Sequence, residues 1–253
     1  MKALLLLLLA IKAAAPAGDY TWPRAAAHAD TLAERFVPPE GATRAAAATD
    51  SFGAWLRGLP LLPTGTPVRL FDGKPKARQD VHAAVVDLDV GNRDLQQCAD
   101  AVMRLRAEYL YAHGQRVIFH PDPRKPRPLA FARGDRKTFG KYLVQVFAQA
   151  GSASLAAEMT KPSGPVQPGD VLIQGGYPGH AVLVLDVAVS DSGHRYLLLG
   201  QSYMPAQQFH VINNLGDPTR SPWFEEAALD GDGVVTPEWK PFHRADVRRF
   251  DEN

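Results

Sequence analysis

The fold is decided by a stretch in the last third of the chain, Gly175-Gly176-Tyr177-Pro178-Gly179-His180-Ala181-Val182-Leu183-Val184-Leu185. Its glycine-rich start predicts a turn with room for a ligand, and the apolar run after His180 predicts a strand buried on both faces. We expect this strand to cover 180–189, with further strands at 170–174, 196–203 and 209–212. The last third of the chain therefore predicts an antiparallel sheet.

Helices are predicted upstream of this sheet. Asp94-Leu95-Gln96-Gln97 resembles a capping box, so we expect a helix from Asp94 to Ala112 that presents one apolar face. Other helices are expected at 51–56 and 135–150, and short strands at 68–71, 83–88 and 116–119. Because helices come first and strands later, without a βαβ repeat, the pattern indicates an α+β fold.

The N-terminal part of the chain differs in composition from the rest. Residues 1–17 combine a basic start, an apolar run at Leu4–Leu9 and small residues at Ala15-Pro16-Ala17, which is typical of a signal peptide. We therefore expect an exported protein, periplasmic or extracellular. Residues 18–50 are Ala-rich and predict a loosely packed arm with a helix near 24–36, whereas 51–253 predict one globular domain. No later stretch is apolar enough to cross a membrane.

Charge and motifs exclude several classes of function. After loss of 1–17 the chain keeps 26 of its 28 basic residues against 27 acidic ones, which gives no electrostatic basis for nucleic-acid binding. The basic stretch 124–137 is interpreted as a solvated loop; the alternative is that it binds an anionic glycopolymer.

The segment Asp230–Thr236 resembles part of a calcium-binding loop, but Ala228 and Trp239 occupy positions that need carboxylates. We expect no metal and no organic cofactor.

Cys98 is the only cysteine of the chain. An unpaired thiol is a liability in an oxidising compartment, so Cys98 is either buried and inert or used in chemistry. Its place in the opening turns of a helix favours a thiolate, since the helix dipole is positive there. Small apolar packing is the alternative interpretation of this residue.

His180 is the candidate base for such a thiol. Pairing of Ala188 with either Gly193 or Arg195 would place Gln201 or Tyr203, respectively, opposite His180 on the same sheet face. Gln201 is therefore the candidate for orienting the imidazole.

Four more residues are expected around the site. A helix that begins at Asp94 would engage the Cys98 N–H with the Asp94 carbonyl, so the oxyanion donor would have to be Gln97, Gln96 or another group, and Gln97 is the candidate. The substrate-binding candidates are Tyr177, Gly179 and Tyr203.

Two stretches resemble the histidine half of the NlpC-type and CHAP-type cell-wall peptidases and amidases. They are Gln167-Pro168-Gly169-Asp170-Val171-Leu172-Ile173 and Gly179-His180-Ala181-Val182-Leu183-Val184. In those proteins a Pro-Gly-Asp turn leads into a strand, the catalytic histidine opens the next strand, and the cysteine opens an earlier helix. The resemblance implies a papain-like fold in which a helix bearing Cys98 packs on an antiparallel sheet. The 82-residue interval from Cys98 to His180 is longer than in the compact members.

A more specific resemblance is to a family whose biochemical activity is not characterised. The stretches Ser51-Phe52-Gly53-Ala54-Trp55-Leu56-Arg57, Asp94-Leu95-Gln96-Gln97-Cys98-Ala99-Asp100 and Gln201-Ser202-Tyr203-Met204-Pro205-Ala206-Gln207 look like signatures of an uncharacterised bacterial family, a domain of unknown function.

Three hypotheses of function follow from the sequence. The first is a cysteine hydrolase, an amidase or endopeptidase with a Cys98–His180–Gln201 triad that acts on cell-wall peptide or glycopeptide. The second is a non-catalytic envelope protein that binds through the loops 177–180 and 203–207. The third is an acyltransferase on the same scaffold. The sequence specifies neither the substrate nor the oligomeric state.

Overall fold

The structure, a computed structural model, describes residues 20–22, 30–122 and 127–251. The expected signal peptide lies outside these residues, as do residues 24–29 of the helix expected near 24–36 and part of the basic stretch. No helix of the described chain is long and apolar enough to span a membrane.

Along the chain, helices and short strands are interspersed up to α5, and the strands β5 to β10 follow. The helices are α1 (Leu32–Arg35), α2 (Phe52–Arg57), α3 (Cys98–Ala112), α4 (Arg136–Gln149), α5 (Ser152–Glu158) and the 3-10 turns η1 (Glu226–Asp230) and η2 (Arg244–Asp246). The strands are β1 (Ala42–Arg44), β2 (His82–Val85), β3 (Val117–Phe119), β4 (Leu129–Phe131), β5 (Val171–Gln174), β6 (His180–Ser190), β7 (Arg195–Gln201), β8 (His210–Ile212), β9 (Trp223–Glu225) and β10 (Val247–Arg248).

Eight of the described strands form one antiparallel sheet. Its order is β10-β5-β6-β7-β8-β2, with β1 paired to the far half of β6 and β9 to the start of β7. Strand β6 is central and buried from His180 to Ala188, as its uninterrupted apolar run predicts. The mixed α/β fold with an antiparallel sheet is therefore confirmed. The β3–β4 hairpin is separate from this sheet.

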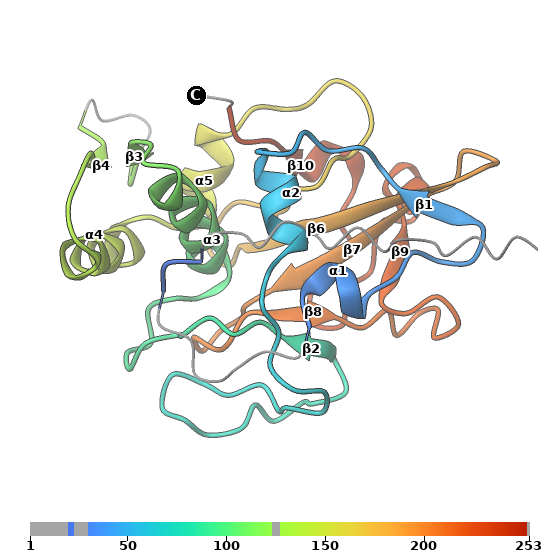
Figure 1. Ribbon diagram of the computed structural model, residues 1–253, viewed down its shortest axis with the longest axis horizontal. Coiled ribbons are helices and arrows are strands. Elements are labelled where there is room, and N and C mark those ends of the chain that lie inside the picture. The colour runs from blue at the N-terminus through green and yellow to red at the C-terminus, as the bar shows by residue number, and fades with distance from the viewer. Residues whose placement is uncertain (1–19, 23–29, 123–126, 252–253) are drawn as a thin grey trace, which may run out of the picture.

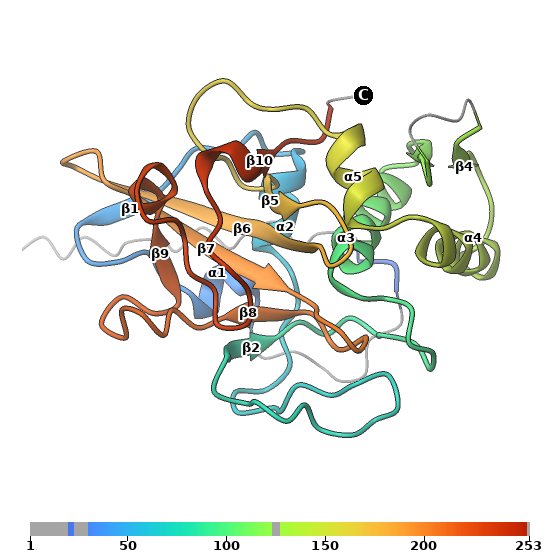
Figure 2. The same cartoon turned by 180° about the vertical axis from the view of Figure 1, so that it is seen from behind.

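The two faces of the sheet bury two hydrophobic clusters. Ala181, Leu183 and Leu185 face the helices in one cluster, whereas Val182 and Val184 face the C-terminal segment in the other. Figure 1 shows α1 and α2 over one face and α3, α4 and α5 grouped at one end of the sheet. Figure 2 shows the C-terminal chain running across the opposite face. Side-chain alternation along β6 therefore separates the helical layer from the C-terminal layer.

The described part of the N-terminal region contacts the central strand. Leu32 is fully buried and Phe36 is 8% exposed. Arg44 of β1 donates from Nε to the buried carboxylate of Asp186 on β6 at 2.7 Å, and Arg57 of α2 does the same at 2.7 Å. Arg44 and Arg57 thus join this part of the chain to the central strand.

Helix α3 also differs from its prediction. It begins at Cys98 rather than at Asp94, and every residue from Cys98 to Leu110 is buried. The amphipathic face expected from the sequence is therefore part of a helix that is covered nearly all round. Two of its charged residues form an ion pair: Arg104 donates from Nε to Glu108 at 2.6 Å, and Arg136 of α4 contacts the same carboxylate. Such pairing is what makes buried charge tolerable.

The turn before β5 is held by a carboxylate. Asp170 accepts from the Gln167 N–H at 2.8 Å, and its two oxygens receive Nε and Nη2 of Arg249 at 2.6 and 2.7 Å. Gly169 has a φ of 96°, a backbone conformation that favours glycine. This Pro-Gly-Asp turn delivers β5 alongside the start of β6, where Gln174 pairs with His180.

Candidate active site

Cys98 lies at the first position of α3. Gln97 is the N-cap residue, and its N–H donates to the Asp100 carboxylate at 3.1 Å. The Asp94 carboxylate instead accepts from the Ala206 N–H at 2.7 Å and from the Gln97 side chain at 2.9 Å. The predicted bond from the Cys98 N–H to the Asp94 carbonyl is therefore wrong. The Cys98 N–H is one of the opening amides of a helix, which have no intrahelical partner.

The Cys98 thiol lies beside the start of β6. The residue is 6% exposed, and Sγ donates to the Gly179 carbonyl at 3.9 Å. Burial raises the thiol pKa to about 11, and the backbone N–H groups of Ala181 and Ala99 only partly oppose this rise. The thiol is consequently neutral near pH 7 in this conformation.

His180 is fully buried and hydrogen-bonded on one side only. Its Nε2 lies 2.8 Å from Oε1 of Gln201, whereas Nδ1 has no hydrogen-bond partner among the described residues. Burial lowers the imidazole pKa to about 4, with the bond to Gln201 acting in the opposite direction. The ring is therefore neutral at physiological pH, as a general base must be before it accepts a proton.

Aromatic rings surround the imidazole of His180. Tyr203 lies edge-on with its ring centroid at 5.1 Å, Trp239 is at 5.1 Å and Phe242 is at 6.2 Å. Trp239 is fixed in turn by a bond from Nε1 to Oε1 of Gln174 at 3.0 Å. These apolar walls account for the desolvation that depresses the imidazole pKa.

Gln201 is itself held by a charged pair. Its Nε2 donates to Oε2 of Glu238 at 3.0 Å, and the other oxygen of Glu238 receives Nζ of Lys76 at 2.6 Å. The Tyr203 hydroxyl donates to the Glu238 carbonyl at 2.8 Å. Sequence reasoning missed Glu238 and Lys76, and it considered Trp239 only as a misfit in a calcium loop. Neither Pro237-Glu238-Trp239 nor Lys76 lies in a periodic segment that would have pointed to the site.

The predicted site residues are only partly brought together. His180, Gln201 and Tyr203 form one contact group, and the thiol of Cys98 is bonded to the residue before His180. No hydrogen bond joins Sγ to the imidazole within the described chain.

The remaining predicted residues lie around this group. Gly179 is buried, and a Cβ at this position would lie 2.1 Å from Oγ of Ser152. Tyr177 is 94% exposed on the turn, so it borders the site from outside. The Gln97 side chain is engaged with Asp94 rather than directed at the thiol.

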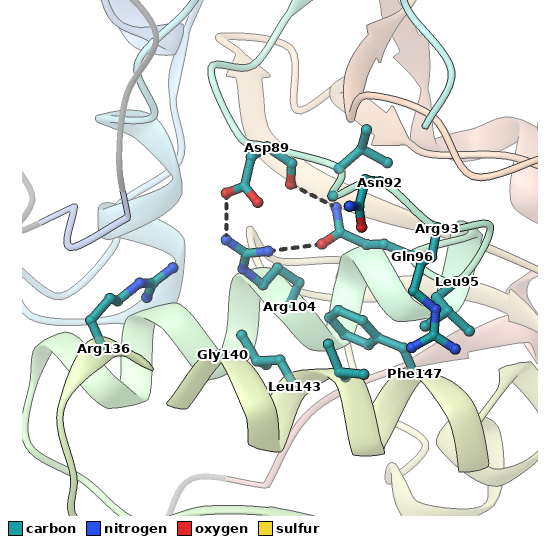
Figure 3. Close-up of a pocket in the computed structure, with 13 residues that line it drawn as sticks. Asp89, Asn92, Arg93, Leu95, Gln96, Arg104, Arg136, Gly140, Leu143 and Phe147 are labelled. Carbon is teal, nitrogen blue, oxygen red and sulfur yellow. Dashed lines mark hydrogen bonds and ion pairs between the residues drawn. The ribbon is translucent and has the colours of Figure 1, made fainter. Parts of the chain in front are cut away.

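A cleft of about 280 Å³ adjoins the segment that leads into Cys98. Its apolar wall is formed by Leu143, Val144 and Phe147 of α4. Figure 3 shows Leu143 and Phe147 on this helix. On the opposite side, Arg104 donates to Oε1 of Gln96 at 2.9 Å and to Asp89 at 2.9 Å. These bonds anchor the loop that ends at Gln97, and thus help to fix where α3 begins.

Fold and site define the class: a mixed α/β protein with an antiparallel sheet and a buried cluster of cysteine, histidine and glutamine at its helical end. The chain belongs to the family described as Domain of unknown function (4846), whose model matches residues 32–122 and 111–249. The resemblance to an uncharacterised family is therefore confirmed. No curated protein and no solved structure matches the chain significantly.

Proposed function

We propose that the chain is an exported cysteine hydrolase with a papain-like arrangement, related distantly to the NlpC-type and CHAP-type enzymes, that cleaves an amide bond in cell-wall peptide material. The observation that carries the proposal is the state of His180. Its Nε2 lies 2.8 Å from Oε1 of Gln201, and its Nδ1 is buried without a partner among the described residues. The two residues that flank it, Gly179 and Ala181, contact the Cys98 thiol through their backbones.

The chemistry follows from that arrangement. His180 Nδ1 takes the thiol proton while Sγ of Cys98 forms a bond to the substrate carbonyl carbon, and the resulting imidazolium stays bonded to Gln201. The opening amides of α3 face the developing oxyanion, including the Cys98 N–H that no intrahelical bond occupies. The imidazolium then protonates the leaving amine, and a water deprotonated by the same ring hydrolyses the thioester.

The neutral resting state sets a requirement on the substrate. Burial disfavours both the thiolate and the imidazolium, so the ion pair forms only when the proton moves during attack. The thiol must also leave the Gly179 carbonyl and approach Nδ1. Substrate binding at the exposed rim, which includes Tyr177 and Met204, supplies that rearrangement in our proposal.

The proposal is tested by trapping an acyl-enzyme. We expect the folded protein to react with p-nitrophenyl acetate and to carry the acetyl group on Cys98, detected by nitrophenol release and peptide mass mapping. Cys98→Ala abolishes the adduct and His180→Ala slows it by roughly 10²-fold or more. His210→Gln is the matched control, because His210 is a second fully buried histidine of the sheet. Acylation that is unaffected by His180→Ala would refute the proposed base.

Two other functions use the same residues. A binding protein is favoured by the sealed thiol together with the exposed side chains of Tyr177 and Met204, which are 94% and 39% exposed. It predicts no adduct on Cys98 in the folded state. An acyltransferase forms the same adduct, but an added amine or alcohol discharges it faster than water does.

A further inference from the structure

The Glu238 carboxylate lies between two side chains, Lys76 and Gln201, and bonds to both. The side chain of Glu238 is 10% exposed and that of Lys76 is 8% exposed, with Nζ and Oε1 2.6 Å apart. The ammonium compensates the buried negative charge, and the second oxygen, Oε2, is left to accept a hydrogen bond. Gln201 supplies that bond through Nε2 at 3.0 Å.

A carboxylate accepts hydrogen bonds and does not donate them. The amide of Gln201 must therefore direct its NH₂ group to Glu238 and its oxygen to His180. Because that oxygen only accepts, the proton of the neutral imidazole must be on Nε2, 2.8 Å away. The lone pair is then on Nδ1, the nitrogen without a partner among the described residues.

We propose that Glu238, held by Lys76, is a positioning residue that sets the tautomer of His180 by fixing the orientation of the Gln201 amide. The tautomer follows from the hydrogen bonds alone, but its importance for catalysis rests on the proposed function. Only the tautomer with hydrogen on Nε2 offers Nδ1 as the base. A carboxylate 37 residues from Gln201 in the sequence thus selects the nitrogen that reacts.

One substitution reverses the chain of hydrogen bonds. In Glu238→Gln, the new amide oxygen stays with the Lys76 ammonium, which can only donate, so the new NH₂ group faces Gln201. Gln201 must then turn its oxygen to residue 238 and its NH₂ group to Nε2 of His180, which moves the imidazole proton to Nδ1. Glu226→Gln is the matched control, because Glu226 is another buried carboxylate held in ion pairs, with Arg195 and Arg244, and it lies outside the His180–Gln201–Glu238 chain of hydrogen bonds.

The tautomer is read from ¹⁵N chemical shifts of the imidazole nitrogens, with the His180 signals assigned by their loss in His180→Gln. We expect Nε2 to be protonated in the wild type and in Glu226→Gln, and Nδ1 to be protonated in Glu238→Gln. A wild-type ring protonated on Nδ1, or a Glu238→Gln protein that keeps the proton on Nε2, would overturn the inference. If Glu238→Gln does not fold, Gln201→Glu is the second variant: its carboxylate can only accept from Nε2, so it should keep the proton on Nε2 without Glu238, and a proton on Nδ1 would overturn the inference.

Acetylation of Cys98 separates this inference from the proposed function. We expect Glu238→Gln to slow acetylation by p-nitrophenyl acetate by roughly 10²-fold, because the wrong tautomer removes the general base. Glu226→Gln should keep most of the rate. If the shifts follow the expected pattern but the wild type never acetylates, the tautomer assignment stands and the hydrolase is refuted. Unchanged acetylation in a Glu238→Gln protein with the reversed tautomer would refute the positioning role.

Discussion

Acidification should unfold the protein in part through His180. Burial among aromatic rings lowers the imidazole pKa from its ordinary value of 6.5 to about 4. Between these two values the unfolded chain binds a proton that the folded chain does not, so the free energy of unfolding decreases as the pH falls. The stabilisation is complete above pH 6.5 and is lost as the pH falls to about 4. Between pH 7 and pH 4 this single group accounts for a loss of about 3 kcal/mol.

Urea denaturation at pH 7 and pH 4 measures this loss in the wild type and in His180→Gln. Other groups titrate in the same range, and His210, whose pKa burial lowers to about 3, is one of them. The relevant quantity is therefore the difference between the two proteins in their change of unfolding free energy. We expect the wild type to lose about 3 kcal/mol more than His180→Gln. Equal losses in the two proteins would mean that the imidazole titrates normally and would refute the reasoning about its burial.

Three more predictions concern single groups. Burial raises the pKa of Asp100 from 3.8 to about 8, so the folded state holds the extra proton and stability falls as the pH rises through this window. In urea titrations the free energy of unfolding of the wild type should therefore fall by about 3 kcal/mol between pH 6 and pH 9, and Asp100→Asn should not show this fall. Asp186→Asn should lower the free energy of unfolding by about 3 kcal/mol, because two arginines lose their shared buried carboxylate; a change within error would contradict this. Gly179→Ala should lower the thermal midpoint, because the new Cβ would meet Oγ of Ser152 at 2.1 Å and two carbonyl oxygens at 2.7 and 2.8 Å. Ser152→Gly should rescue it only in part, and full rescue would show that the carbonyls do not matter.

Local patterns predicted the parts of the site that lie within one element. The apolar run after His180 gave the central strand, and the return strand brought Gln201 within 2.8 Å of the imidazole. The exact register was missed: Ala188 pairs with Tyr196 rather than with Gly193 or Arg195, and a bulge between Val184 and Asp186 then shifts the ladder by one residue, so that Leu183 pairs with Gly200. A bulge inserts one residue without a clear signal in a uniformly apolar run.

Contacts that join distant segments could not be predicted from local patterns. The Asp94 carboxylate bonds to the Ala206 N–H, 112 residues away, so its capping signature did not start the helix. Lys76 and Glu238 are 162 residues apart, and neither belongs to a strand or helix. Propensity and periodicity describe neighbours along the chain, whereas these bonds depend on how the C-terminal segment crosses the sheet.

The most direct test of the central claim is the alkylation of Cys98 by iodoacetamide as a function of pH, in the native wild type and in His180→Ala. We predict that the folded wild type reacts without global unfolding and that His180→Ala reacts roughly 10²-fold more slowly, because the imidazole accepts the thiol proton. Labelling of both proteins only as fast as they unfold would contradict the claim. Cys98 would then be a buried packing residue, and the exposed rim at Tyr177 and Met204 would become the place to look for function.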